Sequence, residues 1–287
     1  MSETESPKAE PSANSNPNHK RGSNSSEDQT DGGGVVKKLK TERFFEIEAD
    51  AAEDKGSRHT MEDTSVVLLD ATADSPSNLR CAHFAIYDGH GGRLAAEYTQ
   101  KHLHANVLSA GLPRELLDVK AAKRAILDGF RKTDEYLLQE SVSGGWQDGA
   151  TAVCVWVLGE TVFVANVGDA KAVVARSSTV DGLQNQTDGK SQLKAIVLTR
   201  EHKAIYPQER ARIQKAGGAV SSNGRLQGRL EVSRAFGDRQ FKKVFGPSDA
   251  VDFVHKLLKD KWITYGTILN FQVIAGTTFS FQSRDII

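Results

Sequence analysis

Four short clusters combine carboxylate, guanidinium and imidazole side chains with glycines, the residue types that bind cations or move protons. The most informative is Asp88-Gly89-His90-Gly91-Gly92, which follows an apolar run. An acid at the end of a buried strand is open to ligands, and Gly89 lets a ligand approach the backbone closely. His90 could donate or accept a proton near neutral pH. A bland tight turn would need the aspartate and a glycine but not the whole run.

The other three clusters are ambiguous when each is taken alone. The range Arg58–Asp63 places an arginine before two adjacent carboxylates, a pattern that is also typical of a solvated loop. The range Asn166–Asp169 fits an ordinary hairpin turn that contains aspartate. The range Gly228–Asp238 mixes glycine, charge and apolar residues and fits neither a regular helix nor a regular strand. Each cluster stays open between a functional and a purely structural interpretation.

The apolar pattern between the clusters predicts which elements position them. Continuous apolar runs predict strands at 81–87, 152–158, 161–167 and 171–175. The last two flank Gly168-Asp169 and predict a hairpin. Helical spacing and capping residues predict helices that begin at Arg93, Asp118, Pro207 and Ser248. This order is not the regular alternation of a doubly wound fold, so it predicts an α+β fold with helices packed on antiparallel sheet.

Composition narrows the classes of function. The 287 residues carry 37 Lys+Arg and 37 Asp+Glu, so the formal net charge is zero. A neutral chain has no global field that would draw it onto nucleic acid or an anionic membrane. We expect no membrane span, because no apolar run reaches about 18 residues, and no secretory signal peptide, because the first residues are polar. Two cysteines cannot form a disulfide framework and indicate a reducing compartment.

The first 43 residues differ in composition from the rest. Up to about Gly34 there is almost no large apolar side chain, so we expect a disordered segment. A basic cluster follows at Val35–Lys40, with His19–Arg21 upstream. It fits either a solvated linker or a nuclear-import signal. We therefore expect a cytoplasmic or nuclear protein, or one found in both places.

Seven motifs in a fixed order resemble the metal-dependent protein phosphatase 2C family of Ser/Thr phosphatases. They are Arg58…Met61-Glu62-Asp63, Asp88-Gly89-His90-Gly91-Gly92, Asp148-Gly149-Ala150-Thr151, Gly168-Asp169, Glu201-His202-Lys203, Lys215-Ala-Gly-Gly218 and Val232-Ser-Arg-Ala-Phe-Gly-Asp238. The chain looks most like the branch of the integrin-linked-kinase-associated phosphatase and its plant relatives. The resemblance implies a two-layer antiparallel β-sandwich flanked by helix pairs, in agreement with the α+β prediction.

The resemblance also implies a reaction that uses two Mg²⁺ or Mn²⁺ ions. The ions would activate a water that attacks the phosphorus of phosphoserine or phosphothreonine in a protein. By resemblance, Asp88 bridges the two metals and the Gly89 carbonyl binds one of them. Glu62 would hold metal-bound water in the second shell. Asp169 lies where some family members bind a further, weaker metal.

Two residues have catalytic roles by the same resemblance. Arg58 would grip the substrate phosphate, because its planar fork suits two phosphate oxygens. His90 would be the general acid that protonates the leaving alkoxide. The implied partner is a phosphoprotein substrate, and we expect a monomer that binds neither nucleic acid nor membrane.

The sequence departs from the family pattern after Lys243. The family presents two further metal-binding aspartates, one in an Asp-Gly-Leu-Trp-type motif and one in an Asp-Asn pair, and neither is found here. We predict a phosphatase 2C-like domain at 44–260 with an internal gap after 243, and a divergent tail at 261–287. Within the tail, Trp262–Ser283 has no charged residue and many β-branched and aromatic ones. Alternative splicing or a gene-model error would give this pattern, and we expect the tail to replace few of the missing strands.

Two hypotheses of function remain. The first is an active Mg²⁺- or Mn²⁺-dependent protein phosphatase. The second is a catalytically impaired variant that acts as a non-catalytic phosphoprotein-binding decoy or regulator. The second explains the gap as well as the motifs, so we predict weak metal binding, low stability and at most trace phosphatase activity. An unrelated binding module would leave the seven ordered motifs unexplained.

Overall fold

The computed structural model describes residues 46–72, 77–178, 192–242, 269–272 and 278–282. All of these residues belong to one compact unit of the chain. The predicted disordered segment at 1–43 and the predicted helix from Ser248 to about Asp260 lie outside the described residues. Both stay predictions.

Among the described residues, six strands form the larger antiparallel sheet. Its order is β1-β2-β3-β4-β8, and β7 pairs with β3 outside this path. The strands are β1 (Thr64–Leu68), β2 (Cys81–His90), β3 (Gly149–Leu158), β4 (Thr161–Val167), β7 (Phe236–Gly237) and β8 (Leu269–Gln272). All ten residues of β3 are buried, because the strand is covered on both faces, and this explains its continuous apolar sequence.

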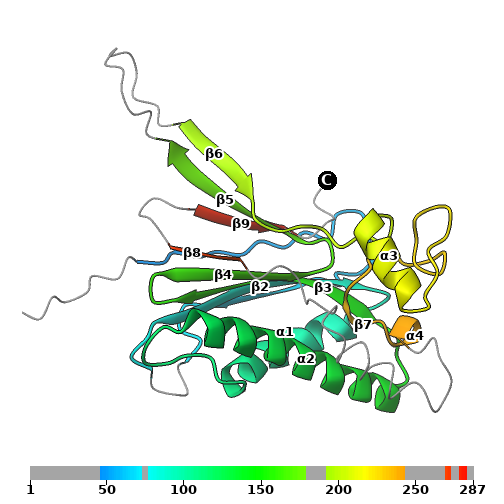
Figure 1. Ribbon diagram of the computed structural model, residues 1–287, viewed down its shortest axis with the longest axis horizontal. Helices are drawn as coiled ribbons and strands as arrows, with labels where there is room; N and C mark the ends of the chain where they lie inside the picture. The colour runs from blue at the N-terminus through cyan, green and yellow to red at the C-terminus, as the bar shows by residue number, and fades with distance from the viewer. Residues whose placement is uncertain (1–45, 73–76, 179–191, 243–268, 273–277, 283–287) are drawn as a thin grey trace, which may run out of the picture. The chain divides into compact units, whose positions relative to one another are not determined.

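A smaller sheet lies on one face of the larger one (Figure 1). Its described strands are β6 (Gln192–Val197), β5 (Lys171–Ser178) and β9 (Thr278–Gln282), with β5 in the middle. Apolar side chains fill the space between the sheets, among them Phe84, Val155, Val162 and Val164. The prediction of an α+β fold built on a two-layer antiparallel sandwich is confirmed.

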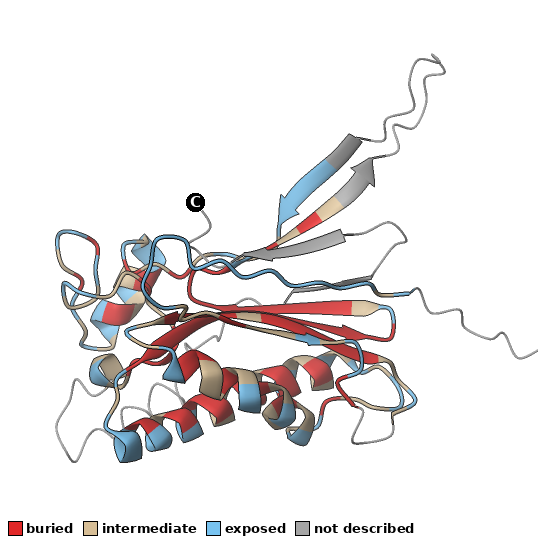
Figure 2. Ribbon diagram, turned by 180° about the vertical axis from the view of Figure 1, so that it is seen from behind, coloured by how far each residue is buried: buried red, intermediate tan, exposed pale blue. Residues whose placement is uncertain are grey.

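Two long helices cover the other face of the larger sheet (Figure 1). They are α1 (Leu94–Ser109) and α2 (Val119–Gly144), and their buried faces point toward the sheet (Figure 2). Asp118 caps α2 as predicted, because its side chain accepts hydrogen bonds from the Lys120 and Ala121 amides at 2.8 and 3.0 Å. Fully buried aromatic residues fix this layer, and they include Tyr87, Phe130, Trp156, Phe163 and Phe236.

Two shorter helices lie near one end of the larger sheet. The helix α3 (Pro207–Lys215) begins at its proline and ends before Gly217, as the sequence predicted. The helix α4 (Arg239–Lys242) directly follows β7 and Asp238. No helix in the described ranges is both long enough and apolar enough to cross a membrane.

The predicted hairpin around Gly168-Asp169 is wrong. The strand β4 pairs with β3 and β8, whereas β5 pairs with β6 and β9 in the other sheet. The chain therefore crosses between the layers at this turn, where Gly168 has a φ of 94°. Two apolar runs on either side of a turn can pair edge to edge or pack face to face, and the sequence pattern does not distinguish these arrangements.

The expectation that the tail replaces few strands also needs correction. The tail supplies β8, which pairs with β4, and β9, which pairs with β5, so it extends both sheets. Its β-branched and aromatic composition suits strands, and without the tail the edges of β4 and β5 would present unpaired backbone groups. The uncharged tail, rich in β-branched and aromatic residues, therefore forms strands that pair within the chain.

Candidate active site

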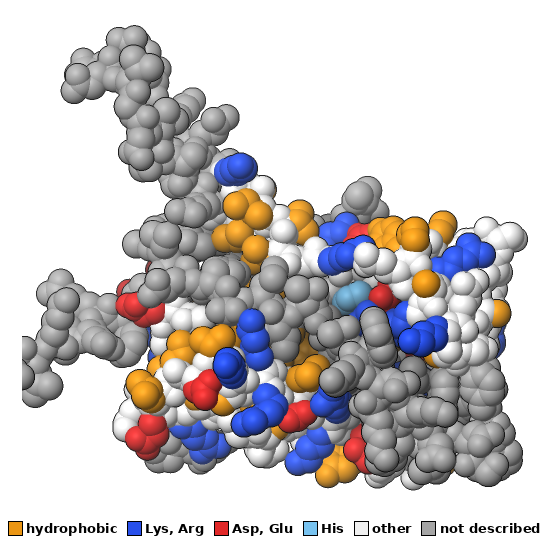
Figure 3. Space-filling view, viewed as in Figure 1, with side chains coloured by type: hydrophobic (Ala, Val, Ile, Leu, Met, Phe, Trp, Pro, Cys, Tyr) orange, Lys and Arg blue, Asp and Glu red, His pale blue; other side chains and the backbone are white. Residues whose placement is uncertain are grey.

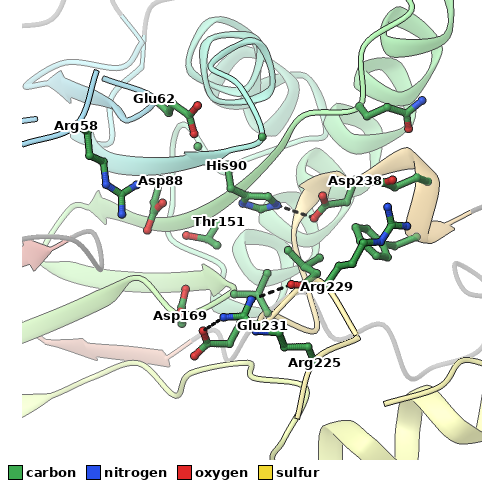
Figure 4. A pocket seen from close by; sticks show the side chains of 17 residues that line it. Arg58, Glu62, Asp88, His90, Thr151, Asp169, Arg225, Arg229, Glu231 and Asp238 are labelled. Carbon is green, nitrogen blue, oxygen red and sulfur yellow. Dashed lines mark hydrogen bonds and ion pairs between the residues drawn. The ribbon is translucent and has the colours of Figure 1, made fainter. Parts of the chain in front are cut away.

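A pocket of about 480 Å³ opens between the larger sheet and the loops that precede β7. All six residues that the sequence singled out for chemistry line it (Figure 4): Arg58, Glu62, Asp88, Gly89, His90 and Asp169. They come from the segment before β1, from the end of β2 and from the turn after β4. The structure therefore brings together residues that are up to 111 positions apart in the chain.

One side of the pocket, which we call the strand wall, is formed by Glu62, Asp88, Gly89, His90 and Thr151. The strand β2 continues through His90, so Asp88 and Gly89 lie within the strand and not directly after it, as the predicted strand at 81–87 implied. Regular pairing with β3 causes this, since Asp88 lies opposite Thr151 and His90 opposite Gly149. Asp88 is only 8% exposed.

Two glycines make the strand wall possible. A Cβ at Gly89 would collide with the backbone carbonyl of Glu62, so glycine allows the Glu62 segment to lie directly on β2. A Cβ at Gly92 would collide with the Asp148 carboxylate, which accepts a hydrogen bond of 2.9 Å from the Leu94 amide. Asp148 thus binds the first turn of α1 and fixes the chain just after the pocket.

The His90 imidazole forms the central polar contact of the pocket. Its Nε2 lies 2.8 Å from Oδ2 of Asp238, a residue that is 4% exposed (Figure 4). Burial alone would lower the pKa of His90, but the hydrogen bond and charge of Asp238, with the charges of Asp88 and Asp169, raise it above its ordinary value. The ring therefore keeps its second proton to a higher pH than an ordinary histidine does.

Sequence reasoning assigned no role to Asp238. Its backbone is held in the left-handed region, with a φ of 51°, a conformation that non-glycine residues seldom adopt. Its amide donates to the Asp148 carbonyl at 3.0 Å, and the preceding Gly237 amide donates to the buried Asp134 carboxylate at 2.9 Å. Lys242 also contacts Asp134, at 2.7 Å. The sequence did contain a signal for this residue, because Asp238 ends the seventh motif.

The opposite side of the pocket, the loop wall, is formed by residues of the segment Arg225–Asp238. Its structural anchor is Glu209 of α3, which is 8% exposed. Arg234 forms two hydrogen bonds with Glu209, at 2.6 and 3.0 Å, and Arg212 forms two more. Ser233 donates to the same carboxylate at 2.6 Å. Burial would raise the pKa of Glu209, but the bonds from Arg234 and Arg212 hold it well below its ordinary value.

Asp169 lies beside a cation of the protein itself. The Lys203 ammonium is 3.7 Å from Oδ2 of Asp169, 3.4 Å from Glu231 and 3.8 Å from Glu201. Both Lys203 and Asp169 are largely buried, with side chains 18% and 2% exposed. An ammonium group thus stands next to the carboxylate for which the resemblance implied an accessory metal.

Some solved structures have a similar fold. A serine-threonine phosphatase 2C from Toxoplasma gondii superposes with a TM-score of 0.56 at 18% identity, over 76% of this chain and 71% of that one. A C. elegans sex determining protein gives 0.57 at 21% identity, over 77% of this chain and 47% of that one. These identities are low, so the likeness concerns the fold.

Sequence comparison defines the family. The model described as "Protein phosphatase 2C" matches residues 47–263. "Probable protein phosphatase 2C 8" of Arabidopsis thaliana is 70% identical over 246 residues, which cover 75% of this chain and 70% of that protein. The human "Integrin-linked kinase-associated serine/threonine phosphatase 2C" is 35% identical over 257 residues, which cover 77% of this chain and 63% of that protein. The chain belongs to the protein phosphatase 2C family, whose members are Ser/Thr protein phosphatases.

The described side chains do not fit the two-metal centre that the resemblance implies. Across the described ranges, no three or more His, Cys, Asp or Glu residues lie close enough together to hold a metal ion. The pocket has three buried aspartates, but Asp238 is bonded to His90 and Asp169 lies beside Lys203. The metal-binding roles expected for Asp88, Gly89, Glu62 and Asp169 stay predictions.

Proposed function

We propose that the pocket binds a phosphorylated serine or threonine side chain of a protein, and that metal-dependent hydrolysis by this chain is at most a trace activity. Protein phosphatases of this family act on phosphoproteins, which supports the class of ligand. One observation carries the proposal: Arg58, Asp88 and His90 line one pocket, while Asp169 and Asp238 already contact Lys203 and His90.

Arg58 is the residue of the chain that would bind the phosphate. Its side chain reaches toward the pocket beside Asp88 (Figure 4). A guanidinium can form two parallel hydrogen bonds with phosphate oxygens, and such charge-assisted bonds are about twice as strong as neutral ones. A dianionic phosphate would also be attracted by the imidazolium of His90, whose raised pKa favours the charged form.

His90 would hold a proton at a defined atom. In the imidazolium both ring nitrogens carry protons, and Nε2–H donates to Asp238. Nδ1–H then remains as a donor to an oxygen of the bound phosphoryl group. Binding and protonation can thus be assigned to Arg58 and His90 alone.

Mg²⁺ or Mn²⁺ would supply an activated water to the pocket in a competent family member. Of the three buried aspartates of the pocket, Asp238 is bonded to His90 and Asp169 lies 3.7 Å from the Lys203 ammonium. Two cations a few ångströms apart repel each other unless carboxylates offset their charge. We therefore expect weak metal binding by this chain.

An active Mg²⁺- or Mn²⁺-dependent phosphatase is the competing proposal. Identity of 70% to an Arabidopsis thaliana protein named as a probable phosphatase favours it. The two proposals differ in what removal of metal does, because phosphopeptide binding through Arg58 and His90 does not require a cation.

The test is phosphopeptide binding measured by fluorescence anisotropy in the presence of a chelator. We expect a phosphoserine peptide to bind and the same peptide without phosphate to bind at least tenfold more weakly, on the order of 1.4 kcal/mol. Failure to distinguish the two peptides would contradict the proposal. Strong binding that appears only when Mn²⁺ is added would favour the active phosphatase.

A further inference from the structure

The loop wall presents an arginine that the proposed phosphate-binding role does not use. The segment Arg225–Glu231 folds back on itself, since Leu226 and Leu230 form an isolated β-bridge with an N–O distance of 2.7 Å. Gln227 and Gly228 both have positive φ values at the turn, 49° and 75°. This loop places Arg229 on the lining of the pocket.

Arg225, the other arginine of the loop, has structural partners. Its Nη1 donates to the Arg229 carbonyl at 2.8 Å, and its Nη2 lies 3.5 Å from the Glu231 carboxylate. Glu231 is in turn 3.4 Å from Lys203. These contacts keep Arg225 within the loop, and they fix the backbone from which the Arg229 side chain extends.

The Arg229 side chain has a different environment. Its guanidinium lies over the ring of Phe241, 5.0 Å from the ring centroid, and the residue is exposed. Within the described part of the chain, no ion pair between Arg229 and a carboxylate occurs. Stacking on an aromatic face holds a guanidinium in place and leaves its N–H edge available to an anion.

Arg58 and Arg229 line the pocket from different segments of the chain. In Figure 4, Arg58 and Arg229 lie on opposite sides of His90. Figure 3 shows several Lys and Arg side chains beside a histidine on the face of the molecule that is also seen in Figure 1. A single phosphoryl group near Arg58 and His90 would leave Arg229 available for a second negative group of the ligand.

We propose that Arg229 is a specificity-determining residue that selects phosphopeptides carrying a second anionic group close to the phosphorylated residue. The inference rests on the proposed phosphoprotein-binding function. An extended peptide advances about 3.4 Å per residue, so the three positions on either side of the phosphoserine are the ones to scan for the second anion. The group is a carboxylate or a second phosphate, since a guanidinium recognises both.

The experiment compares three sets of phosphoserine peptides by fluorescence anisotropy in a chelator. One has neutral flanks, one has an aspartate at each of three positions on either side in turn, and one has a second phosphoserine at those positions. The proteins are the parent chain, Arg229→Ala, Arg229→Lys and the control Arg124→Ala. Arg124 is exposed on α2 and does not line the pocket. Thermal unfolding of each variant establishes that it is folded.

For the parent chain and Arg124→Ala we expect about twofold to fivefold tighter binding of the best acidic peptide than of the neutral one, within the range for ion pairs at a protein surface. In Arg229→Ala the preference disappears while the neutral peptide binds as before, and Arg229→Lys retains part of it. The preference should also shrink as salt rises. A greater gain from phosphate than from aspartate identifies a doubly phosphorylated ligand, and an equal gain identifies an acidic one.

Retention of the full preference in folded Arg229→Ala would overturn the inference, as would equal binding of all three sets by the parent chain. Both results leave phosphate-dependent binding intact, so they do not affect the proposed function. Loss of all phosphopeptide binding by the parent chain is a distinct result, because it contradicts the proposed function and the inference together.

Discussion

The strand wall and the loop wall of the pocket are built in different ways. The strand wall is held by regular pairing of β2 with β3, whose register continues from Cys81 to His90. The loop wall has little regular structure and depends on buried side-chain contacts, chiefly those of Glu209 and Asp134. A backbone ladder distributes its stability over many bonds, whereas the loop wall relies on a few charged groups. Single substitutions should therefore damage the loop wall most.

Removal of Glu209 should have the largest effect. Glu209→Ala leaves Arg234 and Arg212 without their shared carboxylate in a largely buried position, and breaking such a cluster costs about 3–5 kcal/mol. The measurement is the free energy of unfolding in urea. The matched control is Glu97→Ala on α1, which breaks an exposed pair with Arg93 and should cost less than about 1 kcal/mol. Equal losses in the two variants would contradict the contrast between the walls.

A fall in pH should change the contributions of the two walls to the free energy of unfolding in opposite directions. His202 contacts the loop wall, since its carbonyl accepts a hydrogen bond from the Ser233 amide. Burial, with the positive charge of Arg234, lowers the pKa of His202 from 6.5 to about 4. His202 therefore contributes stability above about pH 6.5, and roughly 3 kcal/mol of it is lost as pH falls toward 4. The depressed pKa of Glu209 adds a further loss below about pH 4.5.

His90 in the strand wall behaves in the reverse way. Its raised pKa gives a contribution that is present below about pH 6.5 and is lost as pH rises through the folded-state pKa. Urea unfolding of the parent chain and of His202→Gln between about pH 7.5 and pH 4.5 isolates the His202 contribution, because His90 is the same in both proteins. We expect a smaller acid loss in the variant. An unchanged acid slope would show that His202 is not the group responsible.

Arg58→Ala tests phosphate binding at the pocket, where Arg58 lines the cavity together with the strand wall. The variant loses the bidentate phosphate contact and should bind a phosphoserine peptide about tenfold more weakly, a loss near 1.4 kcal/mol. Its thermal stability should not change, because Arg58 is exposed. Arg58→Lys should recover only part of the affinity, since lysine lacks the planar fork. Unaltered affinity in Arg58→Ala would exclude this residue from phosphate binding.

The smallest effect is expected from Asp238→Asn. Asp238 belongs to the loop wall and contacts His90 of the strand wall. An asparagine keeps the shape and one hydrogen bond but removes the charge that raises the pKa of His90. The ¹⁵N NMR titration of the His90 ring should show a lower pKa in the variant. An unchanged His90 titration would mean that the contact with Asp238 does not form in solution.

Apolar patterns identified the strands and helices of the sandwich, because an element that is buried on one face or on both has apolar residues at regular positions in its sequence. The run at 152–158 and the cap at Asp118 are examples. The pattern could not show that β4 and β5 lie in different sheets, since pairing and stacking bury the same side chains. Nor could it show that the tail pairs with β4 and β5, because edge pairing depends on which edges the rest of the fold leaves exposed.

For the site, the motifs identified the strand wall but not its partners. Asp88 and His90 stand out because acid, glycine and imidazole occur together at the end of an apolar run. The contact of His90 with Asp238 spans 148 positions, and Lys203 meets Asp169 across the turn between the sheets. Such pairings follow from the three-dimensional arrangement and cannot be predicted from a local sequence pattern.

The central claim is that the pocket retains phosphate binding but has lost most of its capacity for metals. Calorimetric titration of the whole 287-residue chain with Mn²⁺, followed by phosphopeptide turnover in the same samples, tests it most directly. We predict binding too weak to saturate below the millimolar range, with trace turnover that Asp88→Asn abolishes. Tight binding of two Mn²⁺ ions together with robust turnover would contradict the account.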